Sequence, residues 1–151
     1  MSTTDFIPEI EYKEILKKTV VSCIDIIINN NGKFLLLKRK NEPAKGRWWL
    51  PGGRIHRGET FETACARKVK QETGLDIKSF ENLGVVETIF DSGPFGDPVH
   101  TINVMASVDS DGDVNMDSQS EEYVWLDRID EKYSIHEDTI KYLKKLGYKY
   151  G

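Results

Sequence analysis

Residues 48–75 read WWLPGGRIHRGETFETACARKVKQETGL, and this stretch does most to determine how the whole chain folds. The Pro-Gly-Gly segment at 51–53 predicts a turn whose backbone geometry suits glycine. Glu59 and Thr60 are typical of a helix start, apolar residues then recur at helical spacing, and Gly74 ends the pattern. A glycine-rich turn that leads into a short, charged helix is a common way to hold phosphates and a divalent metal.

The length and composition indicate an ordinary globular protein. The 151 residues are enough for a sizeable core, so we expect a single domain that spans 1–151. No apolar run is long enough to cross a membrane, and the start lacks the pattern of a signal peptide, so we expect a cytoplasmic protein. Cys23 and Cys65 stand in apolar surroundings, which favours buried free thiols over a disulfide.

The charge is unevenly distributed along the chain. The net charge of −4 argues against a nucleic-acid polymer as a partner. Residues 38–57 nevertheless contain seven Lys or Arg and one acid, a cluster that can hold a small anionic ligand beside the glycine-rich turn. For Lys40, Lys45 and Arg57 we prefer a simple solvated surface.

The apolar patterning predicts a mixture of strands and helices. Strands are expected at 20–28, 34–37, 83–90, 101–108 and 123–126, and helices at 60–73 and 136–146. A weak amphipathic helix at 5–18 is expected to serve packing or dimerisation. This order fits an α/β sandwich in which a mixed sheet packs against helices.

From Gly53 onward the chain resembles the Nudix box, a pattern of two glycines, several glutamates, an arginine and aliphatic residues at fixed spacing. Seven positions match, namely Gly53, Glu59, Arg67, Val69, Glu72, Gly74 and Leu75. Lys68 and Gln71 stand where the family has glutamates. The resemblance implies a Nudix-like α/β/α sandwich with a mixed sheet and a hydrolase that uses Mg²⁺, or alternatively Mn²⁺.

Residues outside the box resemble the GDP-mannose mannosyl hydrolase branch of that family. They are Val21 to Asp25, Lys38-Arg39, Pro43-Ala44, Gly46, Trp48, Pro51 to Arg54, Gly84-Val85, Asp117, Gln119, Tyr123, Trp125-Leu126 and His136. In that branch water attacks the anomeric carbon of the sugar, and the nucleoside diphosphate leaves. The resemblance also implies a homodimer.

The same resemblance assigns site residues. A single Mg²⁺ would be held by the Gly52 carbonyl, the Glu72 carboxylate and Gln119. Arg39 and Arg54 would bind the substrate and stabilise the departing phosphates, and Asp25 would face the substrate cleft. Arg67 takes either this catalytic role or a structural ion pair with Glu59.

The charged face of the predicted central helix explains why one metal is expected. Positions 68, 71 and 72 share one helix face, where three glutamates would gather two or more Mg²⁺. Here only Glu72 is an anion, and Lys68 either pairs with it or occupies the vacant metal position.

The general base is the main departure from the branch. Ser120 stands where the branch has a histidine, and a serine hydroxyl is no base near neutral pH. Glu121 or Glu122 is the candidate replacement, against the alternative that both are solvated loop charges. Trp48 and Trp49 either stack on the nucleobase of a substrate or pack in the core, and we favour core packing.

Two other functions stay open at this point. One is cleavage at phosphorus, on ADP-ribose or a nucleoside triphosphate, although the loss of two box glutamates counts against a route that usually uses several metals. The other is a non-catalytic Nudix-like module that binds a nucleotide.

Overall fold

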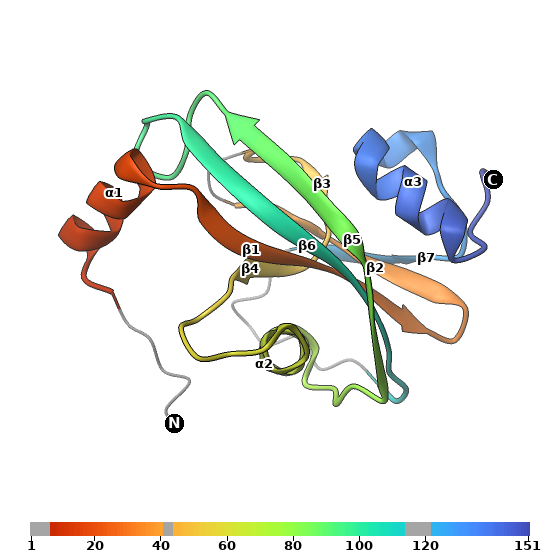
Figure 1. The fold of residues 1–151 in the computed structure, drawn as a ribbon. Coiled ribbons are helices and arrows are strands. Elements are labelled where there is room, and N and C mark those ends of the chain that lie inside the picture. Colours follow the sequence, from red (N-terminus) through yellow and green to blue (C-terminus); the bar gives the residue numbers. More distant parts are fainter. Residues whose placement is uncertain (1–6, 41–43, 114–121) are drawn as a thin grey trace.

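The computed structural model describes residues 7–40, 44–113 and 122–151, which form a seven-stranded sheet with three α-helices (Figure 1). The strands are β1 (Val21–Asn30), β2 (Lys33–Lys38), β3 (Trp48–Trp49), β4 (Gly52–Arg54), β5 (Ser79–Phe90), β6 (Val99–Asp109) and β7 (Tyr123–Leu126). The helices are α1 (Glu9–Lys18), α2 (Phe61–Thr73) and α3 (Glu137–Lys145), with a 3₁₀ turn at Glu131–Tyr133.

The sheet is mixed, as the sequence predicts. Its strand order is β3-β2-β1-β6-β5, with β4 paired to β1 and β7 paired to β2. β1 and β6 run parallel, whereas the other pairs are antiparallel. β1 lies at the centre because its nearly continuous run of isoleucines suits a strand that is covered on both faces.

The two faces of β1 pack against different helices, which gives three layers. Ile24 and Ile26 belong to one core cluster with Cys65 and Val69 of α2. Ile27 belongs to a second cluster with Leu143 of α3. Figure 1 shows α2 and α3 on opposite sides of the sheet, which confirms the α/β/α sandwich.

α2 begins and ends where the sequence predicts. Thr60 is its N-cap and forms a capping box with Thr63, and Gly74 closes the helix with a left-handed backbone (φ 74°). α1 is less well packed than expected, because Leu16 is buried while Ile10 is 82% exposed. No helix within the described ranges is long and apolar enough to cross a membrane.

The predicted turn at 51–53 is wrong. Gly52 and Gly53 form strand β4 and pair with Asp25 and Ile24 of β1, without a positive φ at either glycine. Glycine is required at 52 for close approach, since a Cβ there would lie 2.2 Å from the carbonyl oxygen of Ile24 and 2.9 Å from Asp25 Oδ1. The sequence pattern alone does not distinguish a glycine that close approach requires from a glycine that a turn requires.

β5 begins at Ser79, four residues before the predicted start at 83. It lies at the end of the sheet's strand order, and most of its first residues are exposed, so no apolar pattern marks them. The pairing with β6 shifts register between Asn82 and Gly84. This shift interrupts the alternation of residues between the two faces of the strand, from which strands are predicted.

Candidate active site

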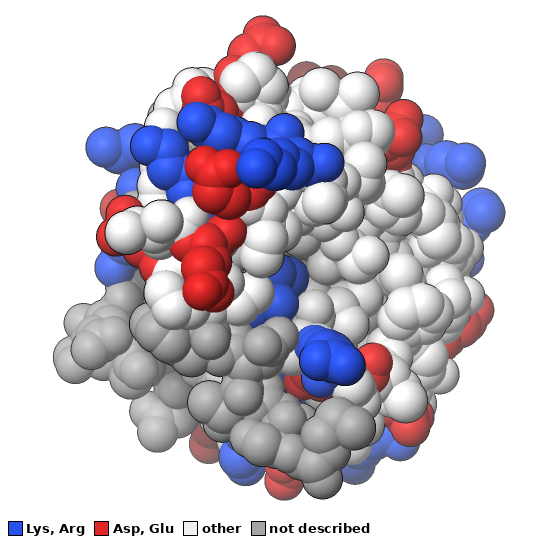
Figure 2. Space-filling model, turned by 60° about the vertical axis from the view of Figure 1, so that its left-hand side comes forward, with Lys and Arg blue, Asp and Glu red and all other residues white. Residues whose placement is uncertain are grey.

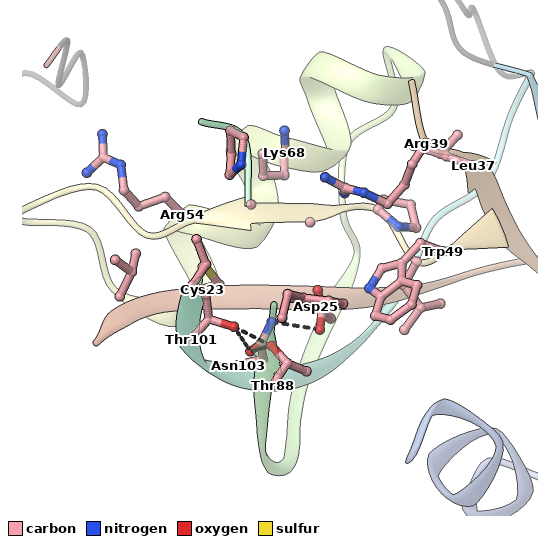
Figure 3. A pocket seen from close by; sticks show the side chains of 18 of the residues that line it. Cys23, Asp25, Leu37, Arg39, Trp49, Arg54, Lys68, Thr88, Thr101 and Asn103 are labelled. Carbon is pink, nitrogen blue, oxygen red and sulfur yellow. Dashed lines mark hydrogen bonds between the residues drawn. The ribbon is translucent and has the colours of Figure 1, made fainter. Parts of the chain in front are cut away.

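A cavity of about 310 Å³ lies where β1 and β4 meet the C-terminal half of α2 (Figure 3). Among the described residues, five charged side chains line it, namely Asp25, Arg39, Arg54, Lys68 and Glu72. All but Lys68 are site residues that the sequence predicts, and they reach the cavity from β1, the end of β2, β4 and α2. The fold therefore brings together residues that are 47 positions apart in the chain.

α2 contributes an ion pair to the cavity wall. Lys68 Nζ lies 3.1 Å from Glu72 Oε1, one helical turn away, and the two side chains are 16% and 29% exposed. Of the two roles that the sequence leaves open for Lys68, the ion pair is thus the one observed.

The donor set suits one Mg²⁺ ion. The cavity wall combines the Glu72 carboxylate with the backbone at Gly52, and oxygen ligands are what Mg²⁺ prefers. Across the described part of the chain, no group of three or more Asp, Glu, His or Cys side chains is placed to share a metal. Mg²⁺ commonly binds through one or two carboxylates together with water and substrate phosphates, which matches this sparse set.

Asp25 both faces the cavity and forms a hydrogen bond inside the protein. Only 8% exposed, it accepts a hydrogen bond from Asn103 Nδ2 at 3.0 Å. Burial raises the pKa of this carboxyl to about 7, against the opposing effects of the Asn103 hydrogen bond and the Arg39 charge.

The Asn103 amide belongs to a polar cluster that sequence reasoning did not assign to the site. Thr101 Oγ1 donates to Asn103 Oδ1 at 2.6 Å, and Thr88 Oγ1 lies within 3.3 Å of the same oxygen. All three side chains line the cavity, and Figure 3 shows them beside Asp25. A usable signal existed, because Thr101 and Asn103 alternate along β6 and so share a face.

Arg39 and Arg54 lie toward opposite ends of the cavity view in Figure 3. Arg39 directly follows β2 and is held by backbone hydrogen bonds to Arg47 and Gly46. Arg54 ends β4, and its guanidinium carbon lies 5.8 Å from the ring centroid of Tyr12 in α1. Two fixed cations on one cavity favour an anionic ligand.

Arg67 is held in a different environment. Its guanidinium binds both carboxylate oxygens of Glu59, with Nε–Oε2 at 2.6 Å and Nη2–Oε1 at 3.0 Å. It does not line the cavity. This geometry fits the structural ion pair, one of the two roles left open by the sequence; the catalytic role stays a prediction.

The remaining predicted residues lie outside the described residues or outside the cavity wall. Gln119, Glu121 and Ser120 lie outside the described residues. Glu122 is described, and its exposed carboxylate lies 3.9 Å from Lys38 Nζ rather than in the cavity wall. A role for Glu122 as a base stays a prediction.

The aromatic and sulfur-containing side chains divide between packing and the cavity. Trp48 packs edge-on against Tyr133, with ring centroids 5.2 Å apart, whereas Trp49 lines the cavity. Both cysteines are free, as expected, but Cys23 is half-buried and lines the cavity. Burial raises the pKa of its thiol to about 12, so this thiol is protonated and is no nucleophile at neutral pH.

Comparisons with known proteins identify the family of this chain. A NUDIX domain profile matches residues 17–146. The chain is 33% identical over 119 residues to the low-salt glycan biosynthesis protein Agl8 of Haloferax volcanii, which covers 77% of this chain and 76% of that protein. It is 36% identical over 118 residues to the ADP-ribose pyrophosphatase of Methanocaldococcus jannaschii, which covers 78% of this chain and 69% of that protein.

A solved structure shows the same fold. The MutT NUDIX hydrolase from Burkholderia pseudomallei superposes with a TM-score of 0.62 at 26% identity, over 72% of this chain and 84% of that one. The chain therefore belongs to the Nudix hydrolase family, whose members act on nucleoside diphosphate derivatives and typically use a divalent metal. The predicted family is confirmed, whereas these relatives do not single out the GDP-mannose mannosyl hydrolase branch.

Proposed function

We propose that this Nudix hydrolase cleaves the pyrophosphate bond of a nucleoside diphosphate sugar by attack of water at phosphorus, with ADP-ribose as the first substrate to test. The observation that carries this proposal is the 36% identity over 118 residues to a protein named as an ADP-ribose pyrophosphatase. The sequence resemblance alone favours attack at the anomeric carbon, whereas this relative favours cleavage at phosphorus.

The cavity offers chemistry for both parts of such a substrate. Arg39, Arg54 and Lys68 line it, and cations of this kind bind diphosphate oxygens. On another side lies the buried pair of Asp25 and Asn103, whose oxygen and amide groups suit the hydroxyls of a sugar. A nucleoside diphosphate sugar carries phosphates and hydroxyls next to each other.

The residues of the chain take distinct parts in the reaction. Glu72 and the Gly52 carbonyl would hold Mg²⁺, which when bound supplies Lewis-acid polarisation of a phosphoryl oxygen. Arg39 and Arg54 bind the diphosphate and stabilise the negative charge that develops on it. Asp25 accepts hydrogen bonds from sugar hydroxyls and fixes the sugar relative to the phosphates.

A second candidate is attack at the anomeric carbon of a substrate such as GDP-mannose, which releases GDP. One observation favours it, namely that α2 presents a single carboxylate, Glu72, to the cavity. Departure of a diphosphate needs one metal and cations that neutralise the leaving group, and Arg39 and Arg54 fit that demand.

Product analysis tests both candidates. The protein is incubated with ADP-ribose, GDP-mannose and GDP-glucose, each with and without Mg²⁺, and the products are separated and identified by mass. The proposal predicts AMP and ribose 5-phosphate from ADP-ribose, only with metal. GDP and free sugar would favour the second candidate, and no product from any substrate would overturn both.

A matched pair of variants links turnover to the site. Glu72→Gln removes the carboxylate from the cavity and should abolish turnover. Glu62→Gln makes the same chemical change on the same helix, but Glu62 does not line this cavity and the variant should keep its activity.

Two further expectations belong to the proposal. Mn²⁺ should replace Mg²⁺, since both ions accept oxygen ligands. The homodimer implied by the resemblance rests on that resemblance alone, and sedimentation equilibrium of the purified protein tests it.

A further inference from the structure

We propose that Lys68 is a built-in competitor of the metal, which blocks Glu72 in the free protein and moves to the diphosphate when ligand and metal bind together. Metal and diphosphate would then bind cooperatively. The inference deepens the proposed function, on which it rests only in requiring that the cavity accepts a diphosphate.

The ion pair between Lys68 and Glu72 places an ammonium against the carboxylate that a metal would use. Lys68 Nζ lies 3.1 Å from Glu72 Oε1, and both side chains are mostly buried in the cavity wall. Glu72 is the carboxylate that α2 presents to the cavity. A metal cation that approaches this carboxylate must displace the ammonium or lie beside it, and two like charges at such a distance repel each other.

The described residues offer few metal ligands besides Glu72. Within the described ranges, no group of three Asp, Glu, His or Cys side chains can compensate for a neutralised Glu72. On the α2 side of the cavity, the ammonium of Lys68 thus offsets the charge of the Glu72 carboxylate, which lowers the net negative charge offered to a metal there. Oxygen atoms from a bound diphosphate supply the missing ligands, which is a common way for Mg²⁺ to bind.

A diphosphate bound in the cavity would give Lys68 an alternative partner within its reach. Its Cε and Nζ lie 3.5 and 3.6 Å from the point where a Cβ on Gly53 would be, so the side chain lies along β4, against a residue without a side chain. Arg39 and Arg54 line the same cavity and would hold a diphosphate there. A lysine carries its charge on a flexible stem, so the ammonium can turn from Glu72 toward a phosphate oxygen.

The consequence is thermodynamic coupling. A diphosphate that binds Lys68 frees Glu72 for the metal, and a metal that binds Glu72 frees Lys68 for the diphosphate. Each ligand then raises the affinity of the other by the same factor, and such factors lie at roughly 5- to 150-fold.

Binding of Mn²⁺, followed by electron paramagnetic resonance of the free ion, tests this without any turnover. For the wild type we expect weak Mn²⁺ binding that strengthens when ADP is added, with protein-free titrations correcting for Mn²⁺ bound by ADP in solution. Lys68→Met should bind Mn²⁺ about tenfold more tightly without ADP, and ADP should strengthen its Mn²⁺ binding by a smaller factor.

Lys70→Met is the matched control. It removes the same charge from the same helix, but Lys70 pairs with the exposed Asp76 and does not line the cavity. Its Mn²⁺ affinity should equal that of the wild type. In the double variant Lys68→Met with Glu72→Gln, the gain from Lys68→Met should disappear.

Each contrary result would overturn the inference. Unchanged or weaker Mn²⁺ binding by Lys68→Met would show that the ammonium does not compete with the metal. An equal gain in Lys70→Met would indicate a general charge effect, and a gain that survives Glu72→Gln would place the metal elsewhere. If Lys68→Met does not fold, Lys68→Gln gives the same readout. Failure to hydrolyse ADP-ribose would refute the proposed function, but the effect of Lys68→Met on Mn²⁺ binding would still support the inference.

Discussion

Arg67 of α2 holds Glu59 through both carboxylate oxygens, at 2.6 and 3.0 Å, and its Nη2 also donates to the carbonyl oxygen of Arg54 at 3.1 Å. The Glu59 side chain is fully buried. One guanidinium therefore joins α2, the segment before it and the end of β4, which carries a cavity-lining arginine. Burial alone would raise the pKa of Glu59, but hydrogen bonds from Arg67 and from the His56 N–H hold it below its usual value.

Loss of this pair should destabilise the protein strongly. Arg67→Ala leaves a buried carboxylate without its partner, which costs about 3 kcal/mol of unfolding free energy or more. Urea denaturation measures the loss. Arg128→Ala breaks an exposed pair with Asp127 and should cost less than about 1 kcal/mol. A stability loss for Arg67→Ala no larger than that of the control would contradict the structural role.

The two glycines of β4 should respond differently to alanine. A Cβ at Gly52 would overlap the carbonyl oxygen of Ile24, so Gly52→Ala must push β4 from β1 and should cost about 3 kcal/mol. A Cβ at Gly53 would meet only the Lys68 side chain, at an ordinary 3.5 Å. Gly53→Ala should therefore lie within about 1 kcal/mol of the wild type. Thermal and urea unfolding of both variants test this, and equal losses would refute the close-approach explanation.

The stability of the protein should carry a pH dependence from Asp25. Its folded pKa of about 7 lies above the value near 4 of an unfolded aspartate, so the folded state binds a proton more tightly. This contribution is fully present below about pH 4 and is lost as the pH rises through about 7. Asp25→Asn lacks it, so the variant should gain stability relative to the wild type as the pH rises.

Urea denaturation in EDTA between pH 4 and 8 measures this difference. Groups that both proteins share cancel in the comparison. The expected change in the difference is on the order of a few kcal/mol over this range. A difference that stays constant with pH would contradict the raised pKa of Asp25.

The cavity arginines should affect turnover rather than stability. Arg39→Met removes a charged donor to the diphosphate and should lower kcat/KM for ADP-ribose by about ten- to a hundredfold. Arg47→Met is the control, since Arg47 is exposed and does not line the cavity. Equal kcat/KM values for Arg39→Met and Arg47→Met would show that the charge of Arg39 does not contribute to turnover.

The sequence alone predicts most of the fold. The run at β1 predicts a central strand because a strand covered on both faces is apolar almost throughout. The spacing from Gly53 to Gly74 identifies the family and predicts the α2 boundaries, since capping residues and a C-terminal glycine are local signals.

Other features depend on contacts that a local pattern does not encode. Gly52 is glycine because β1 lies against it, which is a relation between strands 27 residues apart in the chain. Thr101 and Asn103 become site residues only because β6 pairs in parallel with β1 and brings Asn103 to Asp25. The ion pair between Arg67 and Glu59 likewise becomes evident only from the distance between their side chains.

The atom that water attacks decides whether this protein is a pyrophosphate hydrolase. ADP-ribose is hydrolysed by the protein with Mg²⁺ in ¹⁸O-enriched water, and the products are weighed by mass spectrometry. Attack at phosphorus predicts AMP and ribose 5-phosphate, with one ¹⁸O atom in the phosphate group of one of them. Release of GDP and free mannose from GDP-mannose treated in parallel, or the absence of any hydrolysis of ADP-ribose with Mg²⁺ and with Mn²⁺, would refute pyrophosphate cleavage by this protein.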